Sequence, residues 1–178
     1  MSLRDRIYLF GPGCLGPAVV NALINGALGW AGTRKLAALP VWTLPGVAAD
    51  LTGTAFGVAF GTYLGLALQV KRDARAGKVG PMTSPAVVAA LFGRLPHSTF
   101  ARSVSLGLAA VPVFAVPVIA ALVASGCAEV LTRSFIVLKA TFAALEAATL
   151  APLIVLGALG EMPPRDIPPQ LAPTPNND

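Results

Sequence analysis

Long stretches without any charged side chain constrain this chain more than any other feature of its sequence. Residues 7–33, 51–70 and 103–128 contain no Asp, Glu, Lys or Arg, and residues 134–160 contain only two such side chains. A helix needs about 20 predominantly apolar residues to cross the hydrocarbon core of a bilayer. Each of the four stretches reaches that length, so each is a candidate transmembrane helix.

These stretches favour helices over strands. They lack the apolar–polar alternation of barrel strands, and backbone polar groups in lipid must find hydrogen bonds within their own segment. Six of the last eighteen residues are proline, which is typical of a disordered tail. We therefore expect an all-α integral membrane protein, with a four-helix transmembrane bundle in residues 1–160 and a Pro-rich disordered tail at 161–178. The predicted spans are 8–31, 46–70, 104–126 and 133–159.

The composition also indicates a chain surrounded by lipid. Hydrophobic residues make up 55% of the 178 residues, charged residues make up 12%, and the mean hydropathy is +0.73. About a quarter of the residues of a soluble domain are charged. This chain therefore has too few charges to cover a surface that faces water, and its length fits one domain.

The residue inventory excludes several classes of site. His97 is the single histidine, which excludes a three-histidine zinc site and a bis-histidine haem. Cys14 and Cys127 are too few for a four-thiolate metal site, and the chain has neither a P-loop nor a Gly-x-Ser-x-Gly elbow. We therefore expect no cofactor, no bound metal and no enzymatic activity.

The distribution of Lys and Arg predicts the orientation of the chain. Positive residues concentrate on the cytoplasmic side of short loops. Nine lie on one side of the predicted spans, namely Arg4, Arg6, Lys71, Arg72, Arg75, Lys78, Arg94, Arg102 and Arg165. Three lie on the other side, namely Arg34, Lys35 and Arg133. We expect both termini in the cytoplasm, and usage rich in Ala, Pro, Gly and Arg suggests a bacterial inner membrane.

The basic loop between the second and third spans has two further expectations. Lys71, Arg72, Arg75 and Lys78 are expected to contact anionic lipid headgroups, although orientation alone explains these charges as well. The apolar run at 86–92 is too short to span a bilayer, so it is expected to form a short interfacial helix. The net charge of +5 would suggest a nucleic-acid partner in a soluble protein. Here orientation in the membrane explains most of the positive charge, so we expect no nucleic-acid partner.

Four glycines form the strongest packing signal. They recur every four residues in the second span, at Gly53, Gly57, Gly61 and Gly65. Residues four apart share one face of a helix, and small residues on such a face let membrane helices pack closely. The first span has a matching stripe at Cys14, Ala18, Ala22 and Gly26. Packing of the two stripes within the chain is the favoured interpretation, and a homo-oligomer contact is the alternative.

Polar residues within the spans form the second candidate site. Ionisable side chains inside a membrane cost about 2.5–3.5 kcal/mol each at mid-span, so they need a partner or a wet cavity. Counting depth along the spans predicts an ion pair between Lys139 and Asp50. It also predicts that Glu146 contacts Asn21 or a hydroxyl from another helix. The full intramembrane cluster is Asn21, Asn25, Asp50, Thr54, Lys139 and Glu146.

Three functions are compatible with these features. The first is an oligomeric permease or channel-like protein for a small solute or ion, lined by the intramembrane cluster. The second is a non-catalytic accessory subunit that docks a membrane protein partner through the glycine face, with the charges as structural contacts. The third, an intramembrane enzyme or lipid-binding protein, has the weakest support because the polar inventory is sparse.

Overall fold

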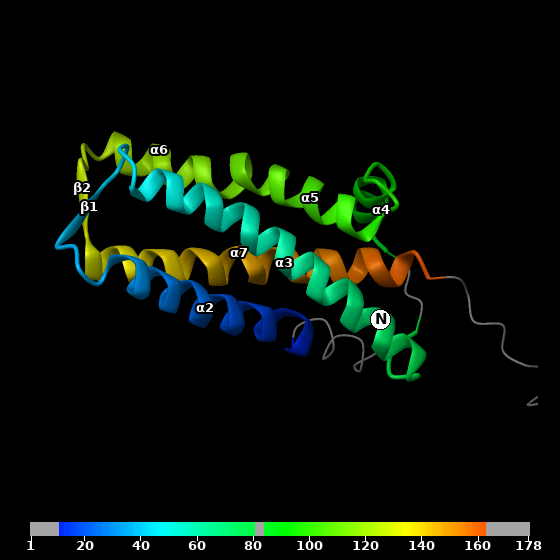
Figure 1. Cartoon of the computed structure of the whole chain (residues 1–178). Coiled ribbons are helices and arrows are strands. Elements are labelled where there is room, and N and C mark those ends of the chain that lie inside the picture. The colour runs from blue at the N-terminus through cyan, green and yellow to red at the C-terminus, as the bar shows by residue number, and fades with distance from the viewer. Residues whose placement is uncertain (1–10, 81–83, 163–178) are drawn as a thin grey trace, which may run out of the picture.

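A computed structural model describes residues 11–80 and 84–162 of the chain, and they are mostly helical (Figure 1). Within them, three helical segments are long and apolar enough to cross a membrane: α3 (Val47–Arg75), the segment Thr99–Ala124 and α7 (Thr132–Gly160). Three of the four predicted spans correspond to these segments. Their length and composition are compatible with a membrane protein.

The helix that corresponds to the first predicted span is different. A π-helical turn, η1 (Gly11–Leu15), leads directly into α2 (Gly16–Thr33), and Pro17 lies just after their junction. Proline has no N–H to donate, and a π-helical turn is a local adjustment to such a residue within a helix. With 18 residues that include two asparagines, α2 is not among the helices that are long and apolar enough to cross a membrane. Residues 8–10 of the predicted span lie outside the described residues.

The third predicted span is one rod with a local irregularity. It consists of α5 (Thr99–Ala110), the π-helical segment η2 (Val111–Ala115) and α6 (Val116–Ala124). Pro112 and Pro117 lie within this rod, and proline removes a backbone donor and clashes with the preceding turn. The π-helical segment is the local adjustment expected at such a site.

The helices lie side by side, with α7 in contact with both α2 and α3 (Figure 1). The α5–α6 rod packs on the side of α3 away from α2. The short helix α4 (Ala86–Gly93) packs against α7 at one end of the molecule, which we call the α4 end. It corresponds to the short helix predicted at 86–92.

A two-stranded antiparallel sheet closes the opposite end, which we call the hairpin end. β1 (Ala38–Pro40) pairs with β2 (Glu129–Leu131), with Leu39 opposite Val130. Sequence analysis predicted no strand here, because three-residue strands are too short to give a pattern. The sheet places the α2–α3 and α6–α7 loops at the same end, as the alternation of four helices requires.

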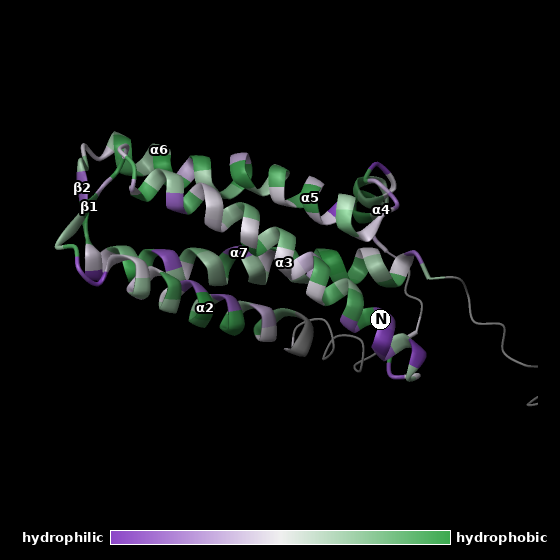
Figure 2. Ribbon diagram, in the orientation of Figure 1, coloured by the Kyte–Doolittle hydropathy of each residue, from purple (hydrophilic) through white to green (hydrophobic). Residues whose placement is uncertain are grey.

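Two apolar cores hold the helices together. Near the hairpin end, Leu51, Ile119 and Phe135 belong to one buried cluster, and near the α4 end Tyr63 and Phe92 belong to another. Large apolar side chains such as Leu23, Leu108 and Leu145 also remain exposed, and apolar residues occur along the length of the helices (Figure 2). Exposed apolar side chains in this number suit contact with lipid or another protein.

The structure also extends two of the predicted helices at the α4 end. Whereas the second span was predicted to end at residue 70, α3 continues to Arg75, and α5 begins at Thr99 rather than at 104. Both extensions carry polar residues, which the search for apolar runs cannot assign. Residues 163–178 of the predicted tail lie outside the described residues.

Candidate functional site

A groove runs along the gap between α2 and α3, and we call it the α2–α3 groove. Its part nearer the hairpin end is a cavity of about 590 Å³, which we call the upper cavity. A second cavity of about 460 Å³ continues toward the α4 end. Asn21 and Gly61 line both cavities, so the two form one continuous groove.

The glycine face of α3 forms one wall of this groove. All four glycines are exposed, and a Cβ built on any of them would have no atom from outside its own turn within 4 Å. The prediction that this face packs against the first span is therefore wrong. The open glycines are Gly53, Gly57, Gly61 and Gly65.

The small residues of α2 pack on α7 instead. A Cβ built on Gly26 would lie 3.4 Å from the Cβ of Ala140, and the thiol of Cys14 donates to the carbonyl oxygen of Ala148 at 3.3 Å. The stripe on α2 thus permits a close helix contact as expected, but with a different helix. Sequence periodicity identifies the helix face that carries the small residues, but it does not identify the helix that contacts this face.

The predicted ion pair is confirmed and lies in the upper cavity. Lys139 Nζ is 2.5 Å from Asp50 Oδ1, and Thr54 Oγ1 donates to the same oxygen at 3.3 Å. The Lys139 side chain is 8% exposed and the Asp50 side chain is 34% exposed. The carboxylate therefore reaches into the groove while the ammonium lies deeper, between α3 and α7.

The two asparagines of α2 also line the upper cavity. Asn25 Nδ2 donates to the backbone oxygen of Asn21 at 3.0 Å. The side-chain amide of Asn21 donates to Pro17 O at 2.9 Å and to Thr62 Oγ1 at 3.3 Å. This last bond crosses from α2 to α3 and links the two walls of the groove.

Glu146 does not join this site. Its side chain is fully buried, and neither carboxyl oxygen has a hydrogen-bond partner among the residues the structure describes. The prediction that Glu146 contacts Asn21 or a hydroxyl is therefore wrong. The Asn21 amide is already engaged by Pro17 and Thr62, and Glu146 is not among the residues that line the groove.

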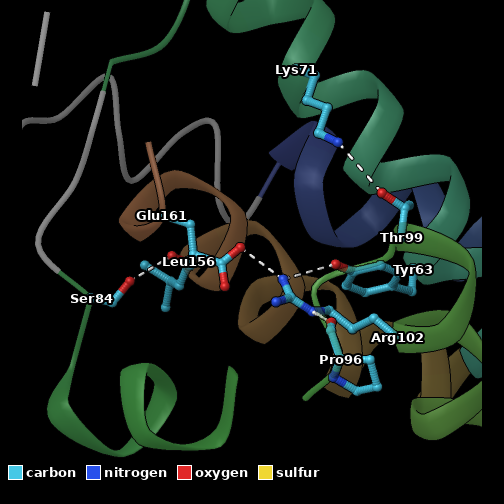
Figure 3. A network of polar contacts seen from close by, with 8 residues as sticks. All are labelled: Tyr63, Lys71, Ser84, Pro96, Thr99, Arg102, Leu156 and Glu161. Carbon is cyan, nitrogen blue, oxygen red and sulfur yellow. Dashed lines mark hydrogen bonds and ion pairs between the residues drawn. The ribbon is translucent and has the colours of Figure 1, made fainter. Parts of the chain in front are cut away.

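A separate polar cluster lies at the α4 end (Figure 3). Arg102 is buried and donates to Glu161 Oε2 at 2.7 Å, to the Tyr63 hydroxyl at 3.3 Å and to Pro96 O at 3.0 Å. Its guanidinium also lies over the ring of Phe92, 5.7 Å from the ring centroid. These contacts join α3, α5 and the end of α7.

Sequence analysis missed this cluster because it counted Arg102 as a loop charge. The arginine lies in the first turn of α5, where its positive charge is paired rather than available to lipid. Little in the sequence signals it, since Tyr63 lies inside the second predicted span and Glu161 lies beyond the end of the fourth. This buried guanidinium corrects the assignment of Arg102 to the basic loop.

The four residues predicted to contact lipid headgroups lie near the end of α3. Lys71 Nζ donates to Thr99 Oγ1 at 3.5 Å, and Lys78 pairs with Asp73 at 3.4 Å. Arg72 and Arg75 are exposed in the last turn of α3. Headgroup binding by this set remains a prediction.

The remaining candidates form no second site in the described part of the chain. Cys14 and Cys127 are free thiols, and His97 is exposed. Within residues 11–80 and 84–162, no three side chains of His, Cys, Asp or Glu gather as metal ligands would.

No family model matches the chain, and comparison with curated proteins and with solved structures found no match either.

Proposed function

We propose that this chain is an integral protein of a bacterial inner membrane that binds a small polar solute in the α2–α3 groove. An oligomer of the chain passes the solute across the bilayer, with both termini in the cytoplasm. The proposal assigns no enzymatic activity and no nucleic-acid partner to the chain. Its partners are membrane lipids and further copies of itself.

The observation that carries the proposal is the convergence of polar side chains on one cavity. Asp50, Lys139 and Asn25 reach the same space of about 590 Å³ from three different helices. Cavities of about 300–1,000 Å³ with a few convergent polar groups are the usual form of small-ligand sites. Ionisable residues inside a membrane most often mark a solute or ion pathway.

The open side of the groove supports association of copies. A polar lining that faces lipid is unfavourable because lipid offers no hydrogen bonds. The exposed glycines allow the backbone of another helix to approach α3 closely. A second copy laid over this face would cover the polar lining and enclose a passage along it.

The same glycine face supports a second candidate function. A transmembrane helix of another protein could occupy the groove, in which case the chain is a non-catalytic accessory subunit. The absence of any atom near the built Cβ positions of Gly53, Gly57, Gly61 and Gly65 favours this interpretation equally. The polar lining of the upper cavity favours the solute.

Reconstitution into liposomes tests the proposal with three solutes of different charge. Vesicles are subjected to an osmotic step of glycine, glycerol or potassium chloride, and stopped-flow light scattering follows recovery of their volume. We expect wild-type vesicles to recover faster than empty ones for at least one solute. Gly57→Leu fills the groove and should slow that recovery at least fivefold.

Gly32→Leu is the matched control. Gly32 is also an exposed glycine of a helix with no neighbour within 4 Å of its built Cβ, and it does not line the groove. Its variant should keep the wild-type rate. Recovery equal to that of empty vesicles for all three solutes would contradict transport and leave the accessory subunit as the remaining candidate.

A further inference from the structure

We infer that the upper cavity recognises a zwitterionic group, in which a primary ammonium and an anionic oxygen acid lie a few bonds apart. This inference rests on the proposed function, because it names the solute class of the same groove. The cavity leaves hydrogen-bonding capacity unused, and the charges of its walls balance.

Lys139 supplies unused donors. An ammonium group has three N–H donors, and within residues 11–80 and 84–162 its one acceptor is Asp50 Oδ1. Two donors therefore remain on a side chain that is 8% exposed and lines the cavity. An anionic oxygen acid of a ligand is the group that would satisfy them.

Acceptors remain unused on the facing walls. Lys139 and Thr54 both donate to Oδ1 of Asp50, and Oδ2 accepts no hydrogen bond in the described residues. The side-chain oxygen of Asn25 likewise accepts none there, although its amide donates to Asn21 O. These oxygens lie on α3 and α2, across the groove from each other, and a ligand ammonium could donate to both.

Charge balance decides between a zwitterion and a simple ion. Asp50 and Lys139 together carry no net charge, so a bound cation or anion would leave one uncompensated charge in surroundings of low polarity. Asp50 would also repel an anion, and Lys139 would repel a cation. A zwitterion keeps the site neutral and pairs each of its ends with the opposite side chain.

Two sources of this chemistry fit the position of the cavity. Lys139 lies seven residues into α7, about 10 Å along its axis. A 29-residue helix is about 43 Å long and exceeds the hydrocarbon core of about 30 Å, so the ion pair lies near the boundary of that core. A free amino acid could reach it from the aqueous side, and a phosphatidylethanolamine headgroup could reach it sideways past the exposed Val20 and Ile24.

Ligand-dependent melting of the full chain in dodecyl maltoside micelles tests the inference. The soluble zwitterionic probes are glycine and γ-aminobutyrate. Acetate and methylammonium each carry one of the two charged groups of a zwitterion, and we call them the halves. Glycine betaine is a zwitterion without N–H donors. The lipid probes are dioleoyl phosphatidylethanolamine, phosphatidylcholine and phosphatidylglycerol. A ligand that binds the folded state raises its Tm by mass action, so each variant is compared with its own ligand-free Tm.

We expect the Tm to rise with glycine or γ-aminobutyrate, or with phosphatidylethanolamine, and not with the halves, betaine or phosphatidylcholine. A response to the amino acids identifies a free solute, and a response to phosphatidylethanolamine alone identifies the headgroup. Lys139→Gln and Asp50→Asn should each weaken the apparent affinity at least tenfold. Gly57→Leu should do the same with the ion pair intact, while Gly32→Leu should not.

Equal responses to acetate, methylammonium and the zwitterions would overturn the inference, as would no response to any probe. The proposed function fails separately. The protein could show no Tm response to any zwitterion while its vesicles still recover from a glycerol or potassium chloride step. That result would support transport and exclude zwitterions as the solute class.

Discussion

The ring of Phe92 in α4 lies directly on the backbone of α7 at Gly157. A Cβ built on Gly157 would be 2.6 Å from two ring carbons of Phe92, which is closer than non-bonded carbon atoms approach each other. Phe92 is 2% exposed and contacts the same core as Tyr63 and Leu159. The missing side chain at Gly157 is therefore what lets α4 dock at this end of the molecule.

Gly157→Ala should destabilise the protein by about 1–3 kcal/mol, the usual cost of overpacking a tight contact. The ring has to move, and with it the cation–π contact to Arg102. Unfolding in mixed micelles with increasing dodecyl sulfate measures the effect. Gly93→Ala is the control. Gly93 follows Phe92 in the short helix α4, and a Cβ built on it has no neighbour within 4 Å. Equal stability of the two variants would show that α4 does not depend on this contact.

The Asp50–Lys139 pair can be tested by a double-mutant cycle. Lys139→Met alone leaves a carboxylate without its ammonium, and Asp50→Asn alone leaves a buried ammonium without a counter-charge. We expect the double variant to be less destabilised than the sum of the two singles, with a coupling of about 0.5–1.5 kcal/mol because Asp50 is partly exposed. Additive single and double effects, measured by the same unfolding titration, would exclude an energetic coupling.

Sequence analysis predicted this pair because depth along a helix follows directly from residue number. The long apolar run at 134–160 likewise placed α7 to within one residue at each end, at 132–160 against a predicted 133–159. Both results depend on distances along one helix axis, which the rise per residue determines.

The errors concern contacts between helices instead. The glycine face of α3 was predicted to pack against the first span, whereas it lies open among the described residues, because periodicity carries no information about whether a helix lies opposite. Arg102 was treated as a loop charge, because a count of positive residues does not distinguish a paired guanidinium from a free one. Glu146 was given a partner because burial without one is rare in folded proteins.

Replacement of the buried carboxyl of Glu146 is predicted to stabilise the protein, whereas the substitutions above are predicted to destabilise it. Since neither oxygen is hydrogen-bonded in the described residues, replacing Glu146 with an apolar side chain of similar size removes a desolvation cost without breaking a contact. Glu146→Met should therefore raise the free energy of unfolding by about 1–3 kcal/mol.

Glu161→Met provides the contrast for that experiment. Glu161 accepts the 2.7 Å bond from Arg102, so its removal leaves a buried guanidinium short of its counter-charge and should lower stability. Both variants are compared by unfolding titration and by retention of helical circular dichroism. A loss of stability with Glu146→Met would show that this carboxyl has a stabilising partner after all.

Association through the glycine face can be tested by disulfide trapping. In a chain with Cys14 and Cys127 replaced by alanine, Gly57→Cys places a thiol in the middle of the open face. If a two-fold axis passes through the centre of this face, the two copies of this thiol lie close together. Oxidation in native-like membranes should give a covalent dimer on a non-reducing gel. Gly32→Cys, exposed but outside the groove, should give none. A dimer from both thiols at equal rates would indicate random collision, and a monomer from Gly57→Cys would contradict a symmetric contact at this face and favour a partner helix.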